Sequence, residues 1–215
     1  ILSKNFLDGV NIINRSSKLE SFFKIEINEK ISRVIFFENS ALRFAEDFNF
    51  GYDTTIKDIS KITGLDKQVV KKILIESDFS GKILKDEYLE KNFFEGKNFR
   101  KISKELILDI GLARFHELIE IMILKNINLK SFLNEKLPLF LTISDKSILK
   151  CYGDKLKNFF SNKGFGSIDF INQTNKKNDY VNANKLVQFG WKKEAVPFVY
   201  EKKSILARLF QLIFK

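Results

Sequence analysis

Side chains that could perform catalysis are scarce in this chain of 215 residues. It has one histidine, His116, and one cysteine, Cys151, and these two residues cannot build a zinc site. No combination of serine, cysteine and histidine indicates a nucleophile with its base. We therefore expect that the chain is not an enzyme. A single cysteine also excludes an internal disulfide, which fits a reducing compartment.

The composition instead points to binding. The formal net charge is +10 and the pI is about 9.5. Such a balance suits a nucleic acid or an anionic membrane surface as the partner. An abundance of lysine that reflects the base composition of a genome explains the same charge equally well.

One candidate for nucleic-acid binding is a helix-turn-helix pattern at about residues 55–77. Ser60 lies four residues before Gly64, and Val70 and Ile73 lie where the second helix must bury apolar groups. The side chains that would then face DNA are Lys67, Gln68, Lys71 and Lys72. Because any two helices packed across a glycine turn satisfy this short pattern, DNA binding is kept as the alternative function.

Residues 204–215 predict an amphipathic helix that lies in a membrane interface. With ~100° per residue, the apolar side chains cover about half of the helix and the cationic ones form a narrow edge. The expected membrane contacts are Ile205, Leu206, Arg208, Leu209, Phe210, Leu212, Ile213, Phe214 and Lys215. A helix docked on its own core is the alternative, but it would be more polar and would not follow a tether containing Pro197. No stretch of the sequence is long and apolar enough to span a bilayer.

The order of the predicted elements favours an α/β protein. A helix is expected over 10–23, strands over 24–27, 33–38, 41–46 and 139–143, and an extended piece over 169–172. Helices are expected over about 54–63, 67–77, 103–124, 147–163 and 179–189. Asn39 and Ser40 suit a tight hairpin turn, and Gly64 a helix end. A block of strands, inserted helices, then a strand and helix indicates one layer with an inserted subdomain.

Three segments carry a resemblance to a known family. Residues 26–43 read E-I-N-E-K-I-S-R-V-I-F-F-E-N-S-A-L-R, where the bacterial actin-like division protein FtsA typically has D-I-G-G-G-T-T-D-I-A-V-F-E-N-G-A-L-R. Residues 102–119 are similar to its I-S-x-x-E-L…A-R-x-x-E-L helix, and residues 179–190 to its last core helix. Together with the terminal helix, these segments make the chain resemble the C-terminal half of FtsA.

The resemblance implies the second lobe of an actin-like, ribonuclease H-like ATPase fold. Subdomain 2A would comprise 1–51 and 136–190, and the inserted, helix-rich subdomain 2B would comprise 52–135. A linker over 191–203 and the amphipathic helix over 204–215 would follow. The chain begins with Ile1 rather than methionine, and we expect it to be a piece of a longer protein.

The same alignment predicts that ATP, the ligand of the family, is not bound in the usual way. The glycines and threonines of the phosphate hairpin fall on Asn28, Glu29, Lys30, Ile31 and Ser32. Close approach of the backbone to phosphate oxygens requires glycine there. The first acidic residue of the motif is retained as Glu26, but the second falls on Arg33. The turn expected to cover the adenosine, residues 143–145, contains no glycine. We therefore expect no cofactor and no metal.

By this resemblance the protein is a membrane-attached adaptor of cell division and septum formation. It would tether FtsZ filaments to the cytoplasmic face of the inner membrane at the division site, and would self-associate into actin-like filaments. The expected contacts with the acidic FtsZ C-terminal tail are Lys101, Lys104, Arg114 and Glu117. These residues suit the polar side of an ordinary helix equally well. No nucleic acid is expected as a partner.

Overall fold

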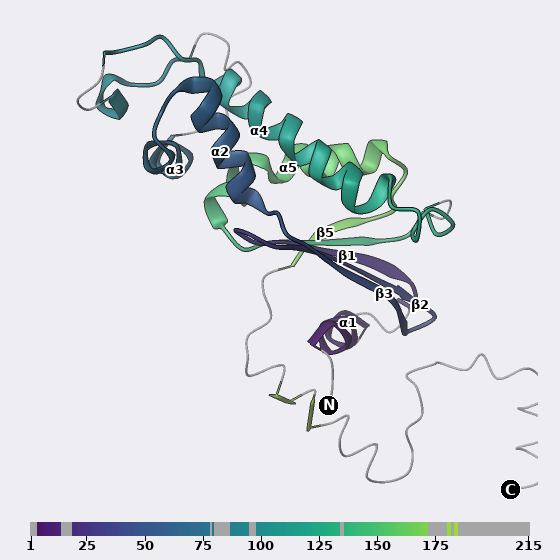
Figure 1. Ribbon diagram of the computed structural model, residues 1–215. Coiled ribbons are helices and arrows are strands. Elements are labelled where there is room, and N and C mark those ends of the chain that lie inside the picture. Colours follow the sequence, from purple (N-terminus) through teal and green to yellow (C-terminus); the bar gives the residue numbers. More distant parts are fainter. Residues whose placement is uncertain are drawn as a thin grey trace, which may run out of the picture.

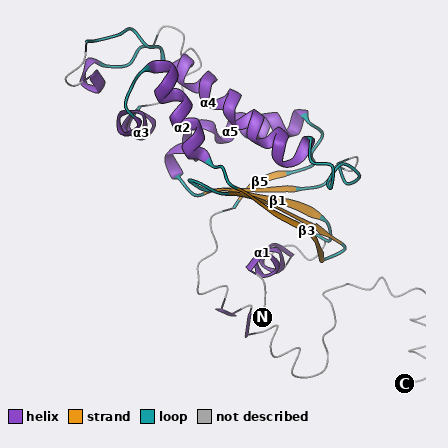
Figure 2. Ribbon diagram, in the orientation of Figure 1, coloured by secondary structure: helices purple, strands orange, loops and turns teal. Residues whose placement is uncertain are grey.

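A single mixed sheet separates two unequal helical layers (Figure 1). The computed structural model describes residues 4–13, 19–77, 79, 87–94, 98–133, 136–171, 180–181 and 183–184. Helix α1 (Lys4–Ile13) lies on one face of the sheet, and all other described helices of four or more residues lie on the opposite side (Figure 2). None of the described helices has the length and hydropathy needed to cross a bilayer.

The sheet has five strands in the order β3-β2-β1-β4-β5. Their bounds are Phe22–Ile27 (β1), Ser32–Glu38 (β2), Ala41–Phe48 (β3), Leu139–Ile143 (β4) and Ile168–Phe170 (β5). Strands β1, β2 and β3 are antiparallel neighbours, while β4 runs parallel to both β1 and β5. Asn39 and Ser40 both have positive φ angles, of 50° and 63°. The tight turn expected at these two residues is therefore confirmed.

Helix α1 ends earlier than the sequence pattern indicates. A helix was expected over 10–23, but α1 ends at Ile13, and Phe22 and Phe23 already belong to β1. These two phenylalanines are fully buried in different clusters, on opposite faces of the sheet. Alternation of this kind is the burial pattern of a strand, which the apolar run alone does not reveal. Gly9 allows close packing, since a Cβ there would lie 1.9 Å from the ring of Phe37.

The helical layer on the opposite face begins directly after β3. It contains α2 (Tyr52–Thr63), α3 (Lys67–Glu76), a short 3₁₀ helix (Lys91–Phe94), α4 (Lys104–Ile119), a π-helical extension (Glu120–Leu124) and α5 (Lys146–Asn162). Gly64 ends α2 with a φ of 66°, as expected. Ser103 caps α4 by accepting a hydrogen bond from the backbone N–H of Leu106.

Helix α4 and its extension bury only part of the face that the sequence predicts. The apolar spacing favours a buried face made of Leu106, Ile110, Ala113, Leu118, Ile121 and Leu124. Leu118 is buried, but Leu106 and Ile121 are both 42% exposed. The other buried side chains of α4 are Ile107, Leu108, Phe115 and Ile119. The reason is that α4 packs against both α2 and α5, so it is apolar on two sides and has no single stripe. Ile62 of α2, also expected inside, is 63% exposed.

Candidate functional site

The two segments that the sequence associates with a ligand lie at the same edge of the sheet. The β1–β2 turn, residues 28–31, follows the carboxyl end of β1. Ile27 pairs with Ile143, the last residue of β4, and the backbone N–H of Ser144 donates to the carbonyl of Ile27 at 3.1 Å. Residues 28–32 and 143–145 are thus brought together, as a shared ligand site requires.

The β1–β2 turn rests directly on the N-terminus of α2. The backbone N–H of Tyr52 donates to the carbonyl of Asn28, and the backbone N–H of Asp53 donates to the carbonyl of Glu29, both at 3.0 Å. This contact depends on Gly51, because a Cβ there would lie 2.0 Å from the carbonyl oxygen of Asn28. Free amides at a helix N-terminus commonly bind phosphate. In this helix the chain's own turn satisfies two of them.

Side chains also close over this edge. Lys71 of α3 pairs with Glu29 of the turn, with Nζ and Oε1 2.9 Å apart. Tyr52 is 8% exposed and thus packed against this edge. Burial, together with the charges of Asp145 and Glu29, raises the pKa of Tyr52. The tyrosine is therefore a neutral, packed side chain at neutral pH.

Two other polar groups of these segments are bound or buried within the protein. The carboxylate of Asp145 accepts from the backbone N–H groups of Ser147 and Ile148, at 2.8 and 3.1 Å, and so caps α5. Ser32, the one hydroxyl retained from the phosphate hairpin of the related family, is fully buried. Its Oγ has no hydrogen-bond partner among the described residues.

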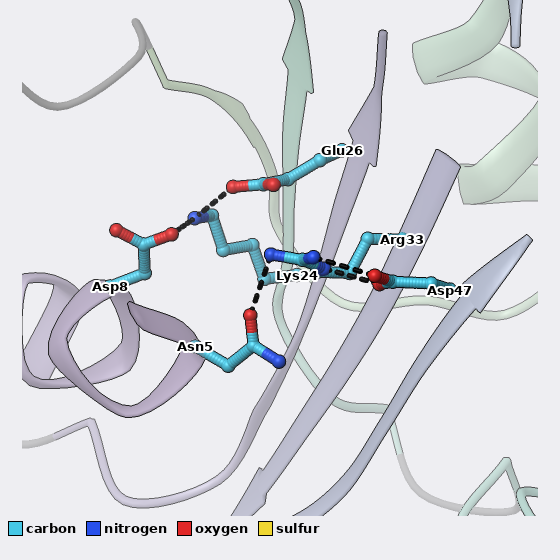
Figure 3. Close-up of polar contacts among 6 residues, drawn as sticks. All are labelled: Asn5, Asp8, Lys24, Glu26, Arg33 and Asp47. Carbon is cyan, nitrogen blue, oxygen red and sulfur yellow. Dashed lines mark hydrogen bonds and ion pairs between the residues drawn. The ribbon is translucent and has the colours of Figure 1, made fainter. Parts of the chain in front are cut away.

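A polar cluster lies beneath the turn, between the sheet and α1 (Figure 3). We define it as Asn5, Asp8, Lys24, Glu26, Arg33 and Asp47. The Nζ of Lys24 lies 2.8 Å from Asp8 and 2.5 Å from Glu26, and Lys24 and Asp8 are both buried. Arg33 makes a two-pronged contact with Asp47 and donates to Asn5 at 2.7 Å. The cluster therefore joins α1 to three strands.

The polar cluster engages the residues that could otherwise serve a nucleotide. Glu26 and Arg33 stand where the resemblance places two acidic residues, and both form ion pairs within the chain. Arg33 holds the pKa of Asp47 below its usual range, and the pKa of Arg33 is itself raised by the same hydrogen bond.

The described residues also contain no group of three or more histidine, cysteine, aspartate and glutamate side chains that could hold a metal ion. His116 stacks on Phe159 with ring centroids 4.0 Å apart, and burial lowers its pKa. Cys151 is buried, and its Sγ contacts the carbonyl of Leu74. Both side chains thus have packing roles in this fold.

The sequence interpretation missed Asp8, Lys24, Asp47 and Tyr52. Lys24 and Glu26 are polar residues at alternate positions of an otherwise apolar strand. That spacing places them on one face and is the signal that could have indicated a buried ionic cluster. No comparable signal exists for Asp8, which lies 16 residues away on another element.

The four expected partner contacts fall into two groups on α4. Lys101 lies over the ring of Tyr88, 4.2 Å from its centroid, and Lys104 pairs with Glu87 at 2.8 Å. Arg114 instead bridges Asp58 of α2 and Glu117, the latter at 2.6 Å. Ten residues of helix separate Lys104 from Arg114, which is about 15 Å. Lys101 and Lys104 therefore lie on a different part of the surface from Arg114 and Glu117.

The helix-turn-helix candidate consists of α2, the turn at Gly64 and α3. Val70 and Ile73 are buried, as this pattern requires. The four side chains expected to face DNA, Lys67, Gln68, Lys71 and Lys72, are all exposed. Two of them have contacts inside the chain: Lys71 pairs with Glu29, and Lys72 lies 5.9 Å from the ring centroid of Phe93.

The expected membrane residues, Ile205 to Lys215, lie outside the described residues. The same holds for the expected linker over 191–203 and for most of the helix expected over 179–189. These three assignments stay predictions from the sequence.

No protein-family model matches this chain, and no curated protein matches it in sequence. Solved structures do match. MreB5 of Spiroplasma citri bound to AMPPNP is 13% identical with a TM-score of 0.53, over 90% of this chain and 60% of that one. The PilM–PilN type IV pilus biogenesis complex matches at 11% identity and a TM-score of 0.52, over 93% and 51% of the two chains. Ta0583, an archaeal actin homologue, matches at 12% and 0.51, over 87% and 55%.

These similarities establish the fold. The chain has the mixed α/β architecture of the actin-like ATPase fold, as the sequence resemblance predicted. It spans about half to three fifths of the length of these structures, which is consistent with a single lobe. None of the three points specifically to FtsA.

Proposed function

We propose that this chain is the second lobe of a membrane-attached, actin-like adaptor that tethers FtsZ filaments to the cytoplasmic membrane at the division site. It acts by binding, not by catalysis, and it does not depend on ATP. It also self-associates into actin-like filaments. The observation that carries the proposal is the β1–β2 edge, where the turn lacks glycine and is held by the N-terminus of α2 and by Lys71.

Two independent features support an adaptor over an ATPase. The side chains of Glu26 and Arg33 form ion pairs within the chain, and the amides of Tyr52 and Asp53 are already engaged. The sequence resemblance to FtsA and the amphipathic pattern of residues 204–215 supply the membrane attachment. A protein with the same fold, PilM, was solved in complex with a partner, PilN. An actin-like lobe is therefore a suitable scaffold for binding another protein.

The N-terminal end of α4 is the surface best suited to an acidic peptide such as the FtsZ tail. Lys101 is exposed there, and Lys104 lies one turn further along. Tyr88, Phe99 and Leu106 are exposed to 37%, 47% and 42%. An apolar patch rimmed by lysines matches a peptide that combines apolar and acidic residues. Arg114 and Glu117 lie about 15 Å further along the helix, away from these exposed apolar side chains.

Peptide binding tests this assignment. We expect a labelled FtsZ C-terminal peptide to bind the chain in fluorescence anisotropy, more weakly as salt increases. Lys101→Gln should weaken binding roughly 3- to 5-fold, the usual effect of one exposed charge at a binding surface. Lys130→Gln removes an equally exposed lysine elsewhere and should change nothing. Equal effects of the two substitutions, or no binding at all, would contradict the assignment.

A further inference from the structure

Helix α5 carries more positive charge than any other described helix. It contains four lysines and one aspartate, a net charge of +3, and Lys163 follows it directly. Helix α3 has a net charge of +2, α1 and α2 are neutral, and α4 has −1. Among the described helices, the positive charge is thus concentrated on α5.

Three of the α5 lysines form a row. At ~100° per residue, Lys146, Lys150 and Lys157 fall within about 40° of one another, and they extend over about 16 Å of helix. All three are exposed, and they lie beside the buried side of the helix, which is formed by Ile148, Tyr152, Leu156 and Phe160. We call Lys146, Lys150 and Lys157 the lysine row.

The charge of the lysine row is only partly offset within the described part of the chain. None of its three lysines makes an ion pair or hydrogen bond with another described residue. Lys71, Lys104 and Arg114, by contrast, all pair with carboxylates. Asp154, exposed on the same helix four residues after Lys150, reduces the charge of this side of α5 from +3 to +2. The remaining positive charge favours an anionic surface that lies alongside it.

We propose that the lysine row lies against anionic lipid headgroups, as a second membrane contact that orients the lobe. This inference rests on the proposed membrane attachment and adds a site to it. A protein partner needs an apolar anchor, and α5 has no large hydrophobic side chain among the exposed ones. Single-stranded nucleic acid would need exposed aromatic rings for stacking. Lipid headgroups need only cations held at the surface.

Vesicle binding by the full chain tests the proposal. The substitutions Lys146→Gln, Lys150→Gln and Lys157→Gln should together weaken binding on the order of 100-fold to vesicles containing about 30 mol % phosphatidylglycerol. Binding to pure phosphatidylcholine vesicles should not change. The matched control, Lys61→Gln, Lys67→Gln and Lys130→Gln, removes the same charge from exposed positions on other elements. It should weaken binding less than about threefold.

The outcomes separate this proposal from the proposed function. Equal losses in the two triple variants would mean that only net charge matters, and would overturn the lysine row. An unchanged vesicle affinity with a loss of duplex DNA binding would assign the row to nucleic acid and also overturn it. In either case, the proposed membrane attachment would still be supported if substitutions within 204–215 alone release the chain from the vesicles. An unchanged melting temperature in both triple variants shows that the comparison is between folded proteins.

Discussion

Replacement of Lys24 by alanine is expected to lower the free energy of unfolding by about 3–5 kcal/mol. Lys24 is 5% exposed, and its ammonium group compensates the carboxylates of Asp8, which is 1% exposed, and Glu26. Without it, two acids remain in a site of low dielectric with less counter-charge. Because Asp8 lies on α1, we expect this helix to loosen from the sheet first. Urea denaturation followed by circular dichroism measures the loss.

The second ion pair of the polar cluster provides the control. Arg33 and Asp47 are also paired, but the Asp47 side chain is 49% exposed, so Asp47→Ala should cost less than about 1 kcal/mol. The pairing lowers the pKa of Asp47, so its contribution is complete above the unfolded pKa of Asp47 and is lost as pH falls through the lowered folded pKa. If Lys24→Ala costs no more than Asp47→Ala, the buried cluster does not hold α1 in place.

Substitution of Leu209 and Phe210 by glutamate should release the full chain from anionic vesicles. Burial of each of these side chains in the interface is worth about 1.5–3 kcal/mol, so the loss of both should weaken binding more than 100-fold. Sedimentation with vesicles, over a range of lipid concentrations, measures this change. It requires no knowledge of the partner protein.

A matched variant separates apolar insertion from simple charge repulsion. Ser204→Glu with Gln211→Glu adds the same two negative charges on the opposite, polar sector of the predicted helix. It should weaken binding far less, since the apolar side stays intact. If the two double variants lose the same affinity, residues 204–215 do not insert as an amphipathic helix.

Local signals in the sequence predicted most of the elements. The alternation of β2, the turn at Asn39 and Ser40 and the helix end at Gly64 are set by neighbouring residues, so they can be inferred without the fold. Helix α4 shows the limit. Its two apolar sides are explained only by the neighbours on either side of it, α2 and α5, and the sequence pattern alone predicted only part of the buried surface.

In the candidate site, too, local features could be predicted from the sequence and tertiary contacts could not. The missing glycines at residues 28–30 are visible in the sequence and predict a poor phosphate site. The contacts that hold the β1–β2 turn are tertiary: the amide of Tyr52 donates to the carbonyl of Asn28, and Lys71 pairs with Glu29, 42 residues away in the sequence. Contacts between residues so far apart produce no pattern in a single sequence from which they could be predicted.

Recruitment of FtsZ to membranes in the absence of nucleotide tests the central claim most directly. Anionic vesicles, FtsZ filaments and the full chain would be mixed and separated by flotation, with and without ATP. The adaptor account predicts that FtsZ floats with the vesicles only when the chain is present, equally well in both conditions, and not with the Leu209→Glu and Phe210→Glu variant. FtsZ that stays below while the chain floats, or that floats only with ATP, would contradict it.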